Sequence, residues 1–104
     1  MNNDIKSVLA ERGSRYGSFD THARITQSLK ASFIGNSRSY LKMTPSMKEA
    51  VDMILHKLGR IGNGDPSYLD SWVDIVGYAQ LVVNELVAAE AAQKEAVESS
   101  SSKQ

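Results

Sequence analysis

The chain has no cysteine, only two prolines and no excess of charge of either sign. Without cysteine it forms no disulfide, no thiolate zinc site and no cysteine nucleophile. Twelve basic residues balance twelve acidic ones, which removes the net-charge argument for DNA coating or for binding an anionic membrane. No uninterrupted apolar run approaches the roughly 18–20 residues that span a bilayer, and the N-terminal residues lack the pattern of a secretion signal. We therefore predict a cytoplasmic protein without a DNA or membrane partner.

The remaining composition is that of an ordinary globular chain. Its 104 residues are 41% hydrophobic and 23% charged, which predicts one domain with a modest core. We expect that domain to cover residues 1–98, followed by a disordered serine-rich tail at 99–104. The charge is unevenly spread, because residues 1–48 carry a formal charge of +5 and residues 49–104 carry −5. These halves either attract each other, within or between subunits, or form solvated helix faces of opposite sign.

Apolar residues recur at helical spacing and nowhere alternate over the length of a strand, which predicts a small all-α bundle. Thr44-Pro45 and Asp65-Pro66 each combine a good N-cap with a proline suited to the first helical position. The glycine-bounded segment 13–17 and the polar segment 35–42 are predicted to be loops. The expected helices span residues 4–12, 20–34, 45–61 and from about 67 into the nineties.

The last two predicted helices carry extensive apolar faces. In the third helix the apolar positions follow a 4-3-4-3 spacing, at Met47, Val51, Ile54, Leu58 and Ile61. The fourth is apolar around most of its circumference, more than one small bundle can cover, so we predict a homo-oligomer. Its broadest face comprises Leu69, Trp72, Val73, Val76, Ala79, Val83, Leu86 and Val87.

Acidic side chains on the same two helices form a candidate metal site. Glu49 and Asp52 share a polar stripe of the third helix with His56 and Arg60, and Asp70 and Asp74 lie one turn apart on the next helix. If the helices run antiparallel, the four carboxylates share a cleft suited to Mg²⁺, a hard cation that prefers oxygen ligands. The alternative is a solvated face with helix-spaced ion pairs. The two histidines, His22 and His56, lack the spacing of a zinc pair.

A second constellation spans Glu11 to Phe19. Arg12 and Arg15 are suited to phosphate oxygens, the glycines permit close backbone approach, and Tyr16 and Phe19 offer flat faces for a base. The alternative is a helix end whose aromatic rings fill the core. The segment is not a Walker loop, because no Gly-Lys-Ser/Thr follows.

The chain resembles a group of small phage and prophage proteins in three motifs. That group shares Glu-Arg-Gly-x-x-Tyr-Gly-x-Phe, Lys-x-x-Arg-Ile-x-x-Gly-Asp-Pro and Asp-x-Trp-x-Asp-Ile-x-Gly-Tyr-Ala. The matching segments run from Glu11 to Phe19, from Lys57 to Pro66 and from Asp70 to Ala79. The resemblance covers about residues 8–87 and implies a phage-encoded protein of the host cytosol.

More distantly, the chain is similar to the MazG-type all-α nucleoside triphosphate pyrophosphohydrolases. Those enzymes place Glu-Glu-x-x-Glu on one helix and Glu-x-x-Asp on the next, around Mg²⁺. The resemblance implies that Glu49 and Asp52 match the last two acids of the first motif, and Asp74 the aspartate of the second. Lys48 and Ser71 stand where two glutamates would be. These departures weaken two-metal hydrolysis and leave a phosphate- or nucleotide-binding pocket.

Three functions remain open from the sequence. The first is a nucleotide-binding protein that sequesters a cyclic or ADP-ribose-type signal against host defence; its phosphate ligands would be Arg12, Arg15, Lys57 and Arg60, and its stacking rings Tyr16, Phe19 or Tyr78. The second is an Mg²⁺-dependent pyrophosphohydrolase of nucleoside triphosphates, with Glu49, Asp52, Asp70 and Asp74 holding metal. The third is a structural interaction module that uses the last helix.

Overall fold

The computed structural model describes residues 2–102 and confirms the all-α prediction. It contains four α-helices and one 3₁₀ turn, and no strand among the described residues. The elements are α1 (Asn2–Tyr16), α2 (Phe19–Asn36), η1 (Tyr40–Lys42), α3 (Pro45–Asn63) and α4 (Leu69–Ser102).

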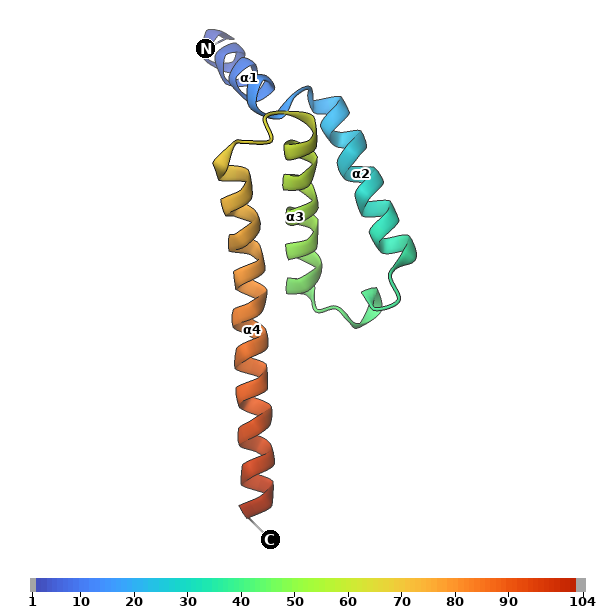
Figure 1. The fold of residues 1–104 in the computed structure, drawn as a ribbon, viewed down its shortest axis with the longest axis vertical. Helices are drawn as coiled ribbons and strands as arrows, with labels where there is room; N and C mark the ends of the chain where they lie inside the picture. Colours follow the sequence, from blue (N-terminus) through green and yellow to red (C-terminus); the bar gives the residue numbers. More distant parts are fainter. Residues whose placement is uncertain (1, 103–104) are drawn as a thin grey trace.

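Three of the helices form a single layer, with α3 between α2 and α4 and each antiparallel to its neighbour (Figure 1). The first helix, α1, lies across the end of the layer at which α3 finishes. α4 continues well past the opposite end of α3, so the molecule measures 71 × 29 × 27 Å. Its radius of gyration is 19.5 Å, whereas a compact chain of this length has about 13 Å. The chain is therefore elongated, and much of its helix surface is exposed to solvent.

The two predicted helix starts have different outcomes. Thr44 caps α3 as expected, because its side-chain oxygen accepts a hydrogen bond of 3.2 Å from the amide of Met47. The start predicted at Asp65-Pro66 is wrong, since α4 begins at Leu69. Asp65 instead uses its carboxylate to accept a 2.9 Å hydrogen bond from the amide of Ser67. This contact favours a turn over a helix cap.

The predicted loop at 13–17 is also mostly helical. α1 passes through Gly13 and ends at Tyr16, supported by the 2.9 Å ion pair between Glu11 and Arg15 one turn apart. Gly17 alone leaves the helix, with φ of +77°, a conformation that glycine adopts readily. The predicted linker 35–42 begins later than expected, since α2 extends to Asn36, and it includes η1. Residues 99–102, expected to be a disordered tail, are helical, and residues 103–104 lie outside the described residues.

The junction between α1 and α2 is held by the loop that follows α3. The side-chain amide of Asn63 donates hydrogen bonds to the carbonyl oxygens of Tyr16, at 2.9 Å, and Ser18, at 2.8 Å. The amide of Asp65 donates to the carbonyl oxygen of Arg15 at 2.6 Å. Side-chain and backbone hydrogen bonds thus fix the turn at Gly17 against the end of α3.

Within the layer, the helix contacts are close but small. Gly59 of α3 lies directly against Thr26 and His22 of α2, where a Cβ atom would collide with both side chains. On the other flank of α3, the Lys57 ammonium forms a 2.8 Å ion pair with Asp74 of α4. Among the described residues, Ala50 is the one buried hydrophobic side chain, at 8% exposed. The single chain therefore encloses very little core.

Most of the apolar surface predicted to be buried is exposed. Trp72, Val76 and Leu86 of α4 are 47%, 66% and 45% exposed, because α4 contacts α3 through a neighbouring face. That contacting face carries Ser71, Ile75, Tyr78 and Val82. By length and mean hydropathy (1.2), the helix segment Leu69–Ser100 also meets the requirement for a membrane span, although no uninterrupted apolar run does.

Candidate functional site

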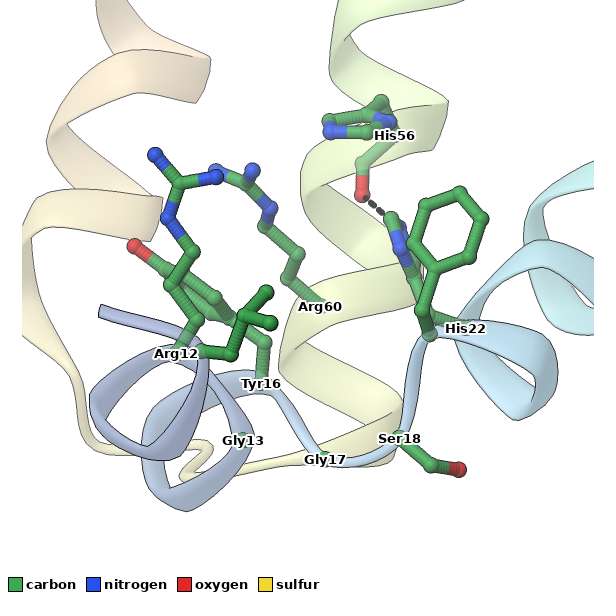
Figure 2. A pocket seen from close by; sticks show the side chains of 10 residues that line it. Arg12, Gly13, Tyr16, Gly17, Ser18, His22, His56 and Arg60 are labelled. Atoms are coloured by element: carbon green, nitrogen blue, oxygen red, sulfur yellow. Dashed lines mark hydrogen bonds between the residues drawn. The ribbon is translucent and has the colours of Figure 1, made fainter. Parts of the chain in front are cut away.

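A cavity of about 320 Å³ lies where α1 meets the ends of α2 and α3. Three sequence segments contribute to it: the last turns of α1, the Gly17 turn with the first turn of α2, and the last turns of α3. Figure 2 shows these side chains around the opening. The lining residues are Leu9, Arg12, Gly13, Tyr16, Gly17, Ser18, Phe19, His22, His56 and Arg60.

Two arginines give this cavity its positive charge. Arg12 from α1 and Arg60 from α3 both line it, and Figure 2 shows their guanidinium groups extending on the same side of the Tyr16 ring. The Arg60 guanidinium lies 4.2 Å from the centre of that ring, a cation–π contact that holds its side chain in place. Among the described residues, no carboxylate forms an ion pair with either arginine. Their charge is therefore available to an anion.

Aromatic and imidazole rings form the opposite wall. The His22 ring contacts the His56 ring edge to face, with centroids 4.6 Å apart, and its Nε2 lies 3.1 Å from the His56 carbonyl oxygen. Phe19 packs edge to face against His22 at 6.2 Å and remains 79% exposed. Its ring thus offers a free apolar surface at the opening.

The surroundings of His56 lower the pKa of its imidazole. Partial burial is the largest cause, and the positive charges of Arg60 and Lys57 act in the same direction. An anion beside this ring would oppose the effect of those charges, because it favours the protonated imidazole. The sequence indicated neither histidine as part of this cavity. Their spacing in the sequence could have indicated them, because His56 lies one helical turn before Arg60 and His22 lies three residues after Phe19.

Arg15, predicted to bind phosphate, lies in an adjoining cavity of about 300 Å³ that shares Arg12, Tyr16 and Arg60 with the first. Arg15 is already engaged. It pairs with Glu11 at 2.9 Å, stacks 4.6 Å from the centre of the Tyr68 ring and donates a hydrogen bond to the Tyr68 hydroxyl. The Tyr68 hydroxyl in turn donates to Asp70 at 2.9 Å, a bond that raises the pKa of Tyr68. Arg15 therefore ties α1 to the start of α4.

Two other predicted ligand residues lie elsewhere. Lys57 is buried between α3 and α4, where its ion pair with Asp74 occupies the ammonium group. Tyr78 lines a separate groove on α3 and α4 together with Glu49 and Glu85. Of the seven residues predicted from the sequence for nucleotide binding, the structure brings four to the main cavity: Arg12, Tyr16, Phe19 and Arg60.

The structure does not bring the four candidate metal ligands together. Asp52 forms a 3.4 Å ion pair with Lys30 of α2, Asp74 pairs with Lys57, and Asp70 accepts the Tyr68 hydroxyl. Glu49 lies in the groove beside Tyr78. Across the described part of the chain, no group of three or more histidine, aspartate or glutamate side chains is placed to hold a metal ion. This donor arrangement does not fit an Mg²⁺ site within one chain.

Comparison with known proteins gives one match. No curated protein sequence and no solved structure matches the chain. The profile of DUF6378, described as a domain of unknown function, matches residues 1–86, which include α1, α2, α3 and the first half of α4. All ten residues that line the main cavity fall inside the matched region. The match covers most of the chain, which therefore belongs to the DUF6378 family.

Proposed function

We propose that this protein binds a phosphate-bearing nucleotide in the cavity between α1, α2 and α3. The observation that carries the proposal is the pair of arginines, Arg12 and Arg60, which line one cavity without a carboxylate partner. Guanidinium groups bind phosphate oxygens through paired, charge-assisted hydrogen bonds. The phosphate of a nucleotide supplies the negative charge that would pair with the two guanidinium groups.

The rest of the cavity suits the base and sugar of the same ligand. Phe19 offers an exposed ring on which a base stacks, an interaction typically worth about 1–3 kcal/mol. Gly13 and Gly17 allow the ligand to approach the backbone closely, and the His56 ring provides a further hydrogen-bonding edge. A volume of about 320 Å³ suits one nucleotide moiety, with part of the ligand extending to solvent.

Binding without hydrolysis is the form of this function that we favour. No carboxylate lines the main cavity. Glu11 in the adjoining cavity is paired with Arg15, and Asp52, Asp74 and Asp70 contact Lys30, Lys57 and Tyr68 respectively. A protein of this kind lowers the free concentration of its ligand by sequestration. A small chain with phosphate-binding residues and a weakened set of acids suits this role, and we infer that the ligand is a signalling nucleotide of the cyclic or ADP-ribose type, sequestered against host defence.

The test is thermal unfolding with a panel of ATP, ADP-ribose and a cyclic dinucleotide. A ligand at 100 times its Kd adds about 2.7 kcal/mol of stability, enough to raise Tm by several degrees. We expect Arg60→Ala to abolish the shift. Arg24→Ala, which removes an exposed arginine paired with Asp20 on α2, is the matched control and retains it. If no nucleotide raises Tm, the proposal is wrong. If the protein releases pyrophosphate from a nucleoside triphosphate in the presence of Mg²⁺, its function is hydrolysis and not sequestration.

A further inference from the structure

One face of the helix layer is apolar and uncovered. On α3, Lys57 points toward α4 and Gly59 toward α2, so these two residues mark opposite flanks of the helix. At 100° per residue, the apolar positions of α3 lie between those flanks on one side, and His56 and Asp52 lie on the other. The exposed positions of α4 project to the same side. We call this surface the apolar face: Met47, Val51, Ile54, Leu58 and Ile61 of α3, and Trp72, Val76, Ala79, Val83 and Leu86 of α4.

The exposed surface area of the single chain is as large as that expected for one subunit of a stable dimer before it assembles. The chain exposes 7881 Å², whereas a compact monomer of 11.4 kDa exposes about 5,800 Å². The difference, about 2,100 Å², comprises the projecting end of α4 and the exposed faces of the layer, and one partner of an obligate dimer buries about 1,000–2,500 Å². Because Ala50 alone is buried among the described hydrophobic residues, the layer needs a second layer to form a core.

We propose that a second copy of this chain covers the apolar face, with the two α4 helices antiparallel. The α4 part of the face is nearly symmetric about Ala79, since Trp72 and Leu86 each lie seven residues from it. Antiparallel pairing places Trp72 of each copy opposite Leu86 of the other. It also places the small Ala79 side chains at the crossing point, where helices approach closely.

Charge favours the same direction. From residue 85 onward, α4 carries the acidic residues Glu85, Glu90, Glu95 and Glu98 and the single base Lys94. The start of α4 lies at the end of the layer that α1 crosses, and α1 carries the bases Lys6, Arg12 and Arg15 and the acids Asp4 and Glu11. In the antiparallel arrangement the acidic part of α4 in one copy runs toward the α1 end of the other, where the bases of α1 outnumber its acids. A lipid bilayer is the weaker occupant, because Asp70, Asp74 and Glu85 interrupt α4 on its other sides.

The matched experiment compares two substitutions at sites of similar exposure. Val76 and Leu81 are 66% and 62% exposed in the single chain, but only Val76 belongs to the apolar face. We expect Val76→Asp to weaken self-association at least 100-fold in analytical ultracentrifugation. Leu81→Asp should leave the dimer intact. The proposal is wrong if the two variants associate equally well. It is also wrong if the wild-type chain stays helical and monomeric at micromolar concentration, or if a monomer floats with phosphatidylcholine–phosphatidylglycerol vesicles.

Cysteine cross-linking tests the orientation without relying on a destabilised variant. The native chain has no cysteine, so single introduced thiols report one position each. Under mild oxidation we expect Ala79→Cys to form a disulfide-linked dimer and Leu86→Cys alone to remain uncrosslinked. A mixture of Trp72→Cys and Leu86→Cys chains should form mixed dimers. Efficient cross-linking of Leu86→Cys to itself would overturn the antiparallel arrangement, and failure of Ala79→Cys to cross-link would overturn the interface.

Discussion

The two faces of the helix layer differ in how their side chains are satisfied. On the opposite, polar face, which carries Asp52 and His56, the Asp52 carboxylate forms an ion pair with Lys30. The junction with α1 adds hydrogen bonds and stacked rings. On the apolar face, Trp72, Val76 and Leu58 contact little within the chain and are 47%, 66% and 36% exposed. A polar side chain needs one hydrogen-bond or ion-pair partner, which a neighbouring helix of the same layer can supply. An apolar face is buried only when a second layer packs against it, and one layer cannot supply that second surface.

Substitution of Gly59 should have the largest effect, because both faces depend on the close contact of α2 and α3. A Cβ atom at Gly59 would collide with Thr26 and His22. We expect Gly59→Ala to lower the free energy of unfolding by about 1–3 kcal/mol, the usual cost of overpacking. Chemical denaturation measures the change. Gly77→Ala is the control: no other group lies within 4 Å of a Cβ there, so the same change in α4 should stabilise by up to about 1 kcal/mol.

Removing the charge of Asp74 should have the next largest effect, since its contact lies inside the layer. Asp74→Asn leaves the Lys57 ammonium, whose side chain is 11% exposed, without its carboxylate. We expect a loss of about 1–2 kcal/mol, below the value for a fully buried pair because Asp74 itself is 46% exposed. Asp52→Asn breaks the more exposed pair with Lys30 and should cost less than about 0.5 kcal/mol. If both substitutions lower the free energy of unfolding by the same amount, burial does not determine how much each ion pair contributes.

Acidification should act on the polar face alone. The pKa of His56 is lowered in the folded chain, so the unfolded chain takes up the proton first as pH falls. Stability is therefore fully present above the ordinary histidine pKa of about 6.5 and declines as pH falls through and below that value. We expect Tm measured from pH 8 to pH 5 to fall less steeply in His56→Gln. A profile unchanged by the substitution would assign the pH dependence to other groups.

Truncation after residue 88 should have the smallest effect, because it removes neither face. The remaining chain retains the cavity, the whole apolar face and the region that matches the DUF6378 family. We expect ligand-induced Tm shifts to be unchanged and self-association to weaken a few-fold at most, through loss of Glu90, Glu95 and Glu98. A loss of association greater than tenfold would assign the contact to the extension of α4 and not to the apolar face.

The sequence predicted the helices well and the site partly, for physical reasons. Thr44 was identifiable as a cap because its hydrogen bond is local, to the amide of Met47. Arg12, Tyr16 and Phe19 were identifiable because they lie close together in one segment. His22 and His56 were not, because 34 residues separate them and their contact depends on how closely Gly59 lets α2 approach α3. The contacts of Asp70 with Tyr68 and of Asp74 with Lys57 were not identifiable for a related reason, since they depend on how the side chains of neighbouring elements are placed.

The length of α4 has a practical consequence. From residue 88 to Ser102 the helix extends about 22 Å beyond the part that faces α3, at 1.5 Å per residue. Figure 1 shows that this end lies opposite α1, and the cavity lies at the α1 end. A fluorescent label on the last turns of α4 is thus far from the cavity of its own chain. In the antiparallel dimer proposed above, the same label lies at the α1 end of the partner, so its emission should respond when a ligand enters the partner's cavity.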